Sequence, residues 1–463
     1  MMHPSGPQMV IGLVIGVAAL VVMILRTKIH TFLALIAAAA LTGLIGGMAP
    51  ADLGKAITTG FGNTLGSIGI VIGFGVMLGR ILEVTGAAQR MALTFLRLFG
   101  RGREEWALGA TGAVVSIPIF CDSGFVILSP LARALAQQAG KPVLSLGVAL
   151  AAGLMSTHHL VPPTPGPLAA AGTFGVDLGL MIFWGLIIAL PVYVVTVLYA
   201  RWLGRRLARP GARTVEVAAG SGGATGVPLM TGGAPEAAIP DETALPGTWR
   251  SFAPIVVPVL LIFLNTALTA AGAQGPLAQY LIFLGNPVIA VGIGLVLAVY
   301  GLMGRAPRQE VLDRVEEGVA SAGIIILVTG AGGALGNVLR ESGAGDYIAQ
   351  QIAHLPLPPL LLPFLVATLV RLVQGSGTVA MITAASITAP ILSSLDVAPV
   401  MAAQAAAVGS MVFSYFNDSY FWVVNRMLGV TDVKTQLLTW SVPSTLGWFT
   451  GLITLLVVNA LFF

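Results

Sequence analysis

The hydrophobic pattern along the chain consists of long apolar runs separated by short polar segments. Ten of these runs are long enough, at about 20 residues each, to cross the hydrocarbon core of a bilayer as helices. They cover residues 8–26, 30–49, 60–83, 142–160, 176–201, 253–272, 279–303, 318–340, 397–416 and 439–462. The pattern therefore predicts an all-α polytopic membrane protein with about ten transmembrane helices.

Two further apolar segments, 106–138 and 356–394, are each too long for a single helix and are interrupted near the middle. The interruptions are "CDSG" (121–124) and "GSG" (375–377). Irregular backbone at membrane depth persists only where protein or a water-filled cavity satisfies its polar groups. We therefore predict two re-entrant hairpins whose tips meet near the bilayer midplane.

The distribution of charge orients the predicted helices. Only 9% of residues are charged and 56% are hydrophobic, whereas about 25% of a soluble domain is charged. Arg and Lys follow every second span, as in the loop 201–213. The positive-inside rule then puts both termini outside, provided that each hairpin returns to the side from which it entered. The net charge of +4 and the single cysteine do not support nucleic-acid binding, a disulfide or a cysteine-based metal site.

The two halves of the chain resemble each other. The stretch "LGRILEVTGAAQRMA" (78–92) matches "LGNVLRESGAGDYIA" (335–349) at six of fifteen positions. The two stretches end spans of opposite predicted direction, so the repeat is inverted, as is typical of secondary transporters. We expect an N-terminal repeat (1–206), a flexible cytoplasmic linker rich in Gly, Pro, Ala and Thr (207–249) and a C-terminal repeat (250–463).

Asp122 and Arg371 are the charged residues closest to the predicted hairpin tips. A carboxylate at membrane depth costs at least about 2–3 kcal/mol and indicates function. Asp122 is interpreted as a proton carrier, or alternatively as an ion-pair partner of Arg371 that only fixes the hairpin. Arg371 has three interpretations: it binds an acidic substrate, pairs with Asp122, or extends to the membrane surface.

The tips and two further breaks add polar groups. Ser123-Gly124 and residues 374–378 offer hydroxyls, an amide and bare backbone N–H groups ahead of half-helices, which favours an anion. "STHHLVPPTPGP" (156–167) carries a histidine pair suited to proton transfer near neutral pH. "YFNDSYFW" (415–422) carries Asp418, a second proton site or a helix cap.

Other signals favour structural roles or are missing. Four tryptophans are interpreted as anchors at the membrane interface: Trp106, Trp184, Trp202 and Trp440. The sequence has no H-E-x-x-H motif, no phosphate-binding P-loop and no nucleophile elbow. ATP-driven transport and intramembrane hydrolysis are therefore unsupported, and we expect no metal and no cofactor.

Several motifs stand out together, at residues 63–90, 117–131, 158–167, 371–380 and 416–429. In this order they resemble the gluconate permease (gluconate:proton symporter, GntP) family of the ion-transporter superfamily. The resemblance implies a homodimer in the bacterial inner membrane whose transport domains move past a fixed scaffold as an elevator.

The resemblance also implies which residues form the site. Asp122, His158, Arg371 and Asn417 to Ser419 match the family pattern, whereas Cys121, Ser123, Thr164 and Tyr420 depart from it. The expected substrate ligands are Ser123, Gly124, His158, Thr164, Arg371, Gln374, Gly375, Ser376, Gly377, Thr378, Asn417 and Ser419. The expected proton-coupling residues are Asp122, His158, His159 and Asp418.

These observations predict a proton-coupled importer of a small hydroxylated carboxylate, gluconate or a related sugar acid. Bringing an anion into a negative cell costs about 2.3 kcal/mol per 100 mV, and one co-transported proton cancels that charge. The alternatives are sodium coupling or D-serine as substrate in the same fold, and less favourably a membrane-embedded enzyme or a channel.

Overall fold

The computed structural model describes residues 6–27, 29–207, 241–343, 347, 350 and 358–463, and within them it contains helices and no β-strand. The helices are α1 (Gly6–Arg26), α2 (Thr31–Ile45), α3 (Pro50–Val84), α4 (Ala87–Phe99), α5 (Glu104–Val115), α6 (Cys121–Ala139), α7 (Val143–Leu160), α8 (Pro165–Phe174), α9 (Leu178–Leu207), α10 (Thr248–Ala270), α11 (Pro276–Leu284), α12 (Pro287–Leu302), α13 (Arg308–Glu341), α15 (Leu361–Gln374), α16 (Gly377–Leu392), α17 (Pro399–Gly409), α18 (Ser419–Met427), α19 (Val433–Gln436), a π-helix η1 (Leu437–Ser441) and α20 (Val442–Phe462). The all-helical class is as predicted.

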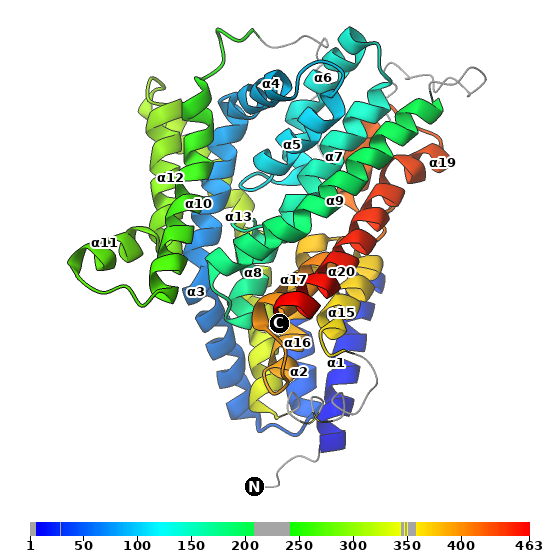
Figure 1. The fold of residues 1–463 in the computed structure, drawn as a ribbon. Coiled ribbons are helices and arrows are strands. Elements are labelled where there is room, and N and C mark those ends of the chain that lie inside the picture. Colours follow the sequence, from blue (N-terminus) through cyan, green and yellow to red (C-terminus); the bar gives the residue numbers. More distant parts are fainter. Residues whose placement is uncertain (1–5, 28, 208–240, 344–346, 348–349, 351–357) are drawn as a thin grey trace.

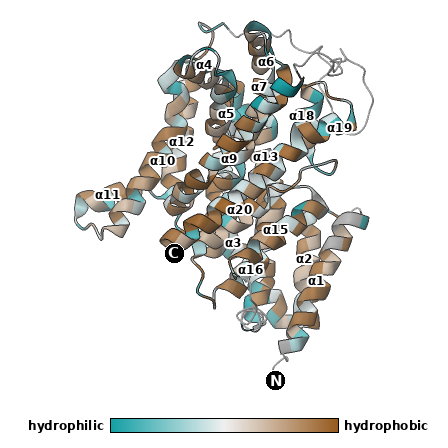
Figure 2. Ribbon diagram, turned by 45° about the vertical axis from the view of Figure 1, so that its right-hand side comes forward, coloured by the Kyte–Doolittle hydropathy of each residue, from teal (hydrophilic) through white to brown (hydrophobic). Residues whose placement is uncertain are grey.

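Several of these helices can cross a bilayer. Among the described residues, five are long and apolar enough, and two bent pairs bring the number to seven. The bends are 47° within α3 and 64° between α11 and α12. Three other predicted spans correspond to the shorter apolar helices or helix segments of α1, α2 and α17. Figure 2 shows hydrophobic residues over the middle of the bundle and hydrophilic ones near α4, α6 and α19.

The long helices α3 and α13 pack against each other, with α2 beside α13 and α12 beside α3 (Figure 1). Small residues permit this contact, because a Cβ on Gly333 would overlap the Thr64 hydroxyl and a Cβ on Gly60 would meet Asn337. Both helices end at equivalent points of the sequence repeat, where Gly86 (φ 76°) and Gly343 (φ 73°) adopt left-handed backbone.

The first predicted hairpin is formed by α5 and α6, which pack on α7. Their outer ends meet, because the Lys141 ammonium lies 2.7 Å from Glu104 and 2.6 Å from Glu105. It also donates to the Gly102 carbonyl at 3.2 Å. The segment therefore returns to the end at which it began.

The predicted position of the break in this hairpin is wrong by several residues. The chain is irregular before Cys121, with Phe120 extended (φ −60°, ψ 140°), and Asp122 lies in the first turn of α6. The cause is that Pro118 cannot donate a backbone hydrogen bond. The Gly124 N–H, by contrast, donates to the Phe120 carbonyl at 2.9 Å and continues the helix.

The second hairpin, α15 and α16, breaks where the sequence predicts. Gly375 has φ 86°, and Ser376 caps α16 by accepting from the Val379 N–H at 3.3 Å. The outer ends of the two helices adjoin one cavity, which residues 358–360 and 395–399 line. This segment therefore also folds back on itself.

The structure contains both breaks predicted beside the hairpins, at 156–167 and 415–422, although the second begins several residues earlier than predicted. Residues 161–164 separate α7 from α8, and residues 410–418 separate α17 from α18. The predicted span 397–416 therefore loses its helical form after Gly409. Most of the predicted linker, 208–240, lies outside the described residues.

The described end of the linker contacts α4. The Arg90 guanidinium donates to the Pro246 carbonyl at 2.7 Å and lies 3.2 Å from the Glu242 carboxylate. Phe95 of α4 also meets Phe252 of α10 edge to face, with ring centroids 5.8 Å apart. These contacts attach α4 to the start of the C-terminal half.

Candidate functional site

The two hairpin tips open onto one cavity of about 410 Å³, within the usual range of roughly 300–1,000 Å³ for ligand pockets. Its lining combines the tips with parts of α7, α13, α18 and η1. The lining residues are Phe120, Cys121, Asp122, Met155, His158, His159, Ile324, Ile325, Val328, Arg371, Gly375, Ser376, Gly377, Thr378, Val379, Ile382, Met411, Asn417, Asp418, Ser419, Tyr420 and Trp440.

The structure brings most of the predicted site residues into this cavity. They are Asp122, His158, His159, Arg371, Gly375, Ser376, Gly377, Thr378, Asn417, Asp418 and Ser419. They come from segments more than 200 residues apart in the chain. The side chain of Gln374 lies outside the described residues.

Three predicted ligands are not among the residues that line it. Ser123 lines a separate cavity between the first tip, α3 and α13. Gly124 packs on α7, where an added Cβ would lie 2.7 Å from the Leu154 side chain. The Thr164 hydroxyl donates to the carbonyls of His158 at 3.0 Å and Val161 at 2.8 Å, so it supports the break after α7.

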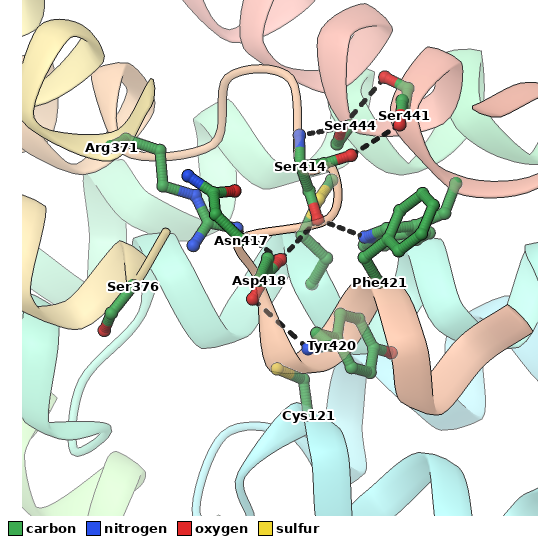
Figure 3. Close-up of polar contacts among 12 residues, drawn as sticks. Cys121, Arg371, Ser376, Ser414, Asn417, Asp418, Tyr420, Phe421, Ser441 and Ser444 are labelled. Carbon is green, nitrogen blue, oxygen red and sulfur yellow. Dashed lines mark hydrogen bonds and ion pairs between the residues drawn. The ribbon is translucent and has the colours of Figure 1, made fainter. Parts of the chain in front are cut away.

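Arg371 forms an ion pair with Asp418. One of the sequence interpretations, that Arg371 pairs with Asp122, is therefore wrong. The Arg371 Nη2 and Asp418 Oδ2 atoms are 2.6 Å apart, and the side chains are 6% and 7% exposed. The loop of Asp418 is held against the last turn of α15, because Asn417 and Tyr415 both donate to the Leu372 carbonyl, at 3.0 and 2.7 Å. Figure 3 shows Arg371 beside this loop.

Both carboxylate oxygens of Asp418 are engaged. Oδ1 accepts from the Tyr420 N–H at 3.2 Å and caps α18, while Oδ2 accepts from Arg371 and from the Ser414 hydroxyl. Of the two sequence interpretations of Asp418, the structure contains the helix cap.

Three buried polar atoms on residues that line the cavity have no hydrogen-bond partner among the residues that the structure describes: Asp122 Oδ1, His158 Nδ1 and His159 Nε2. A buried polar atom without a partner costs about 1–3 kcal/mol. His159 Nδ1 lies 3.0 Å from the Met155 carbonyl, which can only accept, so we assign the proton to Nδ1 and leave Nε2 as an acceptor. Three such atoms at one cavity indicate a binding site.

The second tip brings bare backbone to the cavity. A Cβ on Gly377 would overlap the His159 ring, and a Cβ on Gly375 would overlap the Asn417 carbonyl. Glycine at both positions therefore permits close approach of the N-terminus of α16 to the site. A helix N-terminus favours a negatively charged group.

Sequence reasoning missed the apolar part of the lining. Ile324, Ile325 and Val328 of α13 form one wall, and apolar residues within a long apolar span carry no signal of their own. Trp440 is only 1% exposed, so its interpretation as an interfacial anchor is wrong. In the described part of the chain, no three His, Cys, Asp or Glu side chains are grouped to hold a metal ion.

A helical protein with two hairpins folded into a polar cavity belongs to the class of membrane transport proteins. The family model of GntP family permeases matches residues 8–461. The chain belongs to this family, and with its apolar helices it is an integral inner-membrane protein.

Relatives and a solved structure agree with this assignment. An uncharacterized permease of Haemophilus influenzae is 50% identical over 463 residues, covering 98% of this chain and 93% of its own. The Gnt-II system L-idonate transporter of Escherichia coli is 34% identical over 449 residues, covering 96% and 98%. The Alcanivorax borkumensis YdaH transporter has a similar fold, with a TM-score of 0.64, 18% identity and coverage of 99% and 98%.

Proposed function

We propose that this permease imports a small hydroxylated carboxylate, a sugar acid such as gluconate or L-idonate, by proton symport. The observation that carries the proposal is the cavity between the hairpin tips, where Arg371 lies among buried polar atoms that have no hydrogen-bond partner in the described part of the chain. The L-idonate transporter among the relatives supports the substrate class.

Different groups of the cavity serve the anion and its hydroxyls. A guanidinium binds a carboxylate strongly and with defined geometry, so Arg371 holds the carboxylate, assisted by the N-terminus of α16. His159 Nε2 is an acceptor buried beside the tip, and it accepts a hydrogen bond from a hydroxyl group of the substrate. The apolar wall of α13 excludes water from the carbon chain.

Asp122 carries the coupling proton in this proposal. Its Oδ1 atom is buried without a partner in the described structure, and its neighbour Cys121 offers only a weak thiol donor at 3.8 Å. A carboxylate in such surroundings gains from taking up a proton. The proton cancels the charge of the substrate, which would otherwise cost about 2.3 kcal/mol per 100 mV.

The same proposal includes the membrane arrangement. Ten spans and two re-entrant hairpins form two inverted repeats with both termini outside, and in a homodimer the hairpins move past α3 and α13 as an elevator. The meeting outer ends of each hairpin and the matched glycines after α3 and α13 support it.

Reconstituted protein tests the proposal. Proteoliposomes that are acidic outside should accumulate labelled gluconate or L-idonate above the external concentration, and a protonophore should abolish the accumulation. Accumulation driven by a sodium gradient at equal pH would contradict proton coupling. Equilibration without accumulation would contradict active transport.

A further inference from the structure

Ser414, in the loop between α17 and α18, is held by the start of the last helix. Its backbone N–H donates to the Ser444 hydroxyl at 3.1 Å, and its carbonyl accepts from the Ser441 hydroxyl at 2.5 Å. Its hydroxyl accepts from the indole N–H of Trp440 at 2.8 Å. All four residues are buried, and Figure 3 shows these contacts converging on Ser414.

The indole contact fixes the direction of the next hydrogen bond. An indole N–H can only donate, so the Ser414 oxygen accepts from Trp440 and its own proton is directed to Asp418 Oδ2. The same Asp418 oxygen is 2.6 Å from Arg371 Nη2. A continuous chain therefore runs from Trp440 through Ser414 and Asp418 to Arg371.

The local helix geometry serves this chain. Trp440 and Ser441 end the π-helix η1, a rare conformation that frequently occurs at functional sites. In it, two consecutive side chains both reach Ser414. Trp440 also packs edge to face on Tyr420, with ring centroids 4.8 Å apart, and both line the cavity.

We propose that Ser414 and Trp440 are positioning residues that fix the orientation of the Arg371 guanidinium toward the cavity, where the substrate binds. This inference rests on the proposed function, in which the substrate anion binds Arg371. In the structure, Asp418 Oδ2 accepts hydrogen bonds from both Ser414 and Arg371, so Arg371 supplies only part of the stabilisation of this carboxylate. Without the Ser414 hydroxyl, Asp418 is left with Arg371 and one backbone N–H. The guanidinium then turns toward Asp418 and away from the cavity.

Binding of labelled gluconate to purified full-length protein measures the effect. We expect Ser414→Ala to raise the Kd roughly tenfold, the order expected for losing a charge-assisted hydrogen bond, and Trp440→Phe to raise it severalfold. The double variant should match Ser414→Ala, because both act through one chain. Ser414→Thr, which keeps the hydroxyl, should restore binding. The matched control is Ser410→Ala, since Ser410 is equally buried and, among the described residues, its hydroxyl donates to the Ala407 carbonyl in the last turn of α17 and not to Asp418.

A second measurement needs no substrate. Cys121 is the only cysteine of the chain and lines the same cavity. The rate at which it reacts with an anionic methanethiosulfonate, divided by the rate with a cationic one, therefore reports the positive charge that Arg371 presents to the cavity. We expect this ratio to fall in Ser414→Ala and Trp440→Phe and to stay at the wild-type value in Ser410→Ala.

The outcomes separate the two proposals. If the wild-type protein binds no sugar acid but the ratio is still lowered in Ser414→Ala, the proposed substrate is contradicted and the positioning role is supported. A ratio and a Kd in Ser414→Ala equal to those of Ser410→Ala would overturn the positioning role alone. If Ser414→Ala does not fold, Trp440→Phe decides by the same two measurements.

Discussion

The two hairpin tips face one cavity but differ in how their charges are compensated. The first tip presents Asp122 in the first turn of α6, with one carboxylate oxygen lacking a partner in the described structure. The second follows Arg371, whose guanidinium is paired with Asp418. An acid without an ion pair in the described structure is suited to gaining and losing a proton, whereas a cation held by an ion pair is suited to binding an anion. Within the proposed function, we infer that the first tip carries the coupling proton and the second tip binds the substrate.

The largest expected effect comes from the second tip. Arg371→Gln removes the group that holds the carboxylate in the proposed function, and it leaves Asp418 as an unpaired buried charge, which costs about 3–5 kcal/mol of stability. We expect gluconate binding to fall below detection in calorimetry and the melting temperature to drop. Arg371→Lys keeps the charge without the planar fork and should retain weak binding. Binding by Arg371→Gln within tenfold of wild type would show that the anion sits elsewhere.

The next effect concerns the glycines of that tip. Gly377→Ala forces a methyl group onto the His159 ring, and such overpacking costs about 1–3 kcal/mol. Transport in proteoliposomes should fall strongly. Gly54→Ala and Gly62→Ala are controls, since an added Cβ meets nothing within 4 Å at either position. Full transport by Gly377→Ala would mean that close contact between the tip and α7 is dispensable.

A smaller effect separates lining residues from supporting ones. Thr164→Val removes a buried hydroxyl that donates to the His158 and Val161 carbonyls. We expect a stability loss of about 1 kcal/mol with the Kd for gluconate unchanged, measured by thermal melting and calorimetry. A raised Kd without loss of stability would instead place Thr164 in direct contact with the substrate.

The smallest effect lies at the base of the first hairpin, where Lys141 joins Glu104 and Glu105. Burial would raise the pKa of Glu104, but the hydrogen bonds from Lys141 and from the Gly102 N–H, together with the Lys141 charge, outweigh burial and hold the pKa below its ordinary value of 4.5. The pair therefore stabilises the fold above pH 4.5, and its contribution is lost as the pH falls through the lowered pKa. Lys141→Gln should cost no more than about 1 kcal/mol at pH 7, and less in acid.

Melting curves of Lys141→Gln at pH 7 and in acid check this, with Lys55→Gln, on the exposed side of α3, as the control. A difference from wild type that grows in acid would contradict the assigned ion pair.

The sequence predicted the convergence of the polar site because charged and polar groups inside long apolar segments require a common polar environment. Asp122, the histidine pair, Arg371 and the 417–419 loop are of this kind, and they meet in one cavity. The second break was also predictable, because Gly375 and Gly377 flank a serine that can cap a helix.

Other features depend on packing that the sequence does not encode locally. Asp122, Ser123 and Gly124 look like a break, but an acid is favourable in the first turn of a helix, and Pro118 sets the irregular backbone before it. Arg371 meets Asp418 because the 415–418 loop packs on the end of α15. In sequence, Trp440 looks like an interfacial anchor, and only the structure shows that its indole N–H donates to the buried Ser414 hydroxyl.

The most direct test of the division between the tips uses Asp122→Asn in proteoliposomes, with Ser123→Ala as the neighbouring control outside the cavity lining. Two rates are compared: exchange of labelled gluconate at equal concentrations on both sides, and accumulation driven by a pH gradient. The account predicts that Asp122→Asn retains exchange and loses accumulation, while Ser123→Ala keeps both. Accumulation by Asp122→Asn at the wild-type level would contradict it.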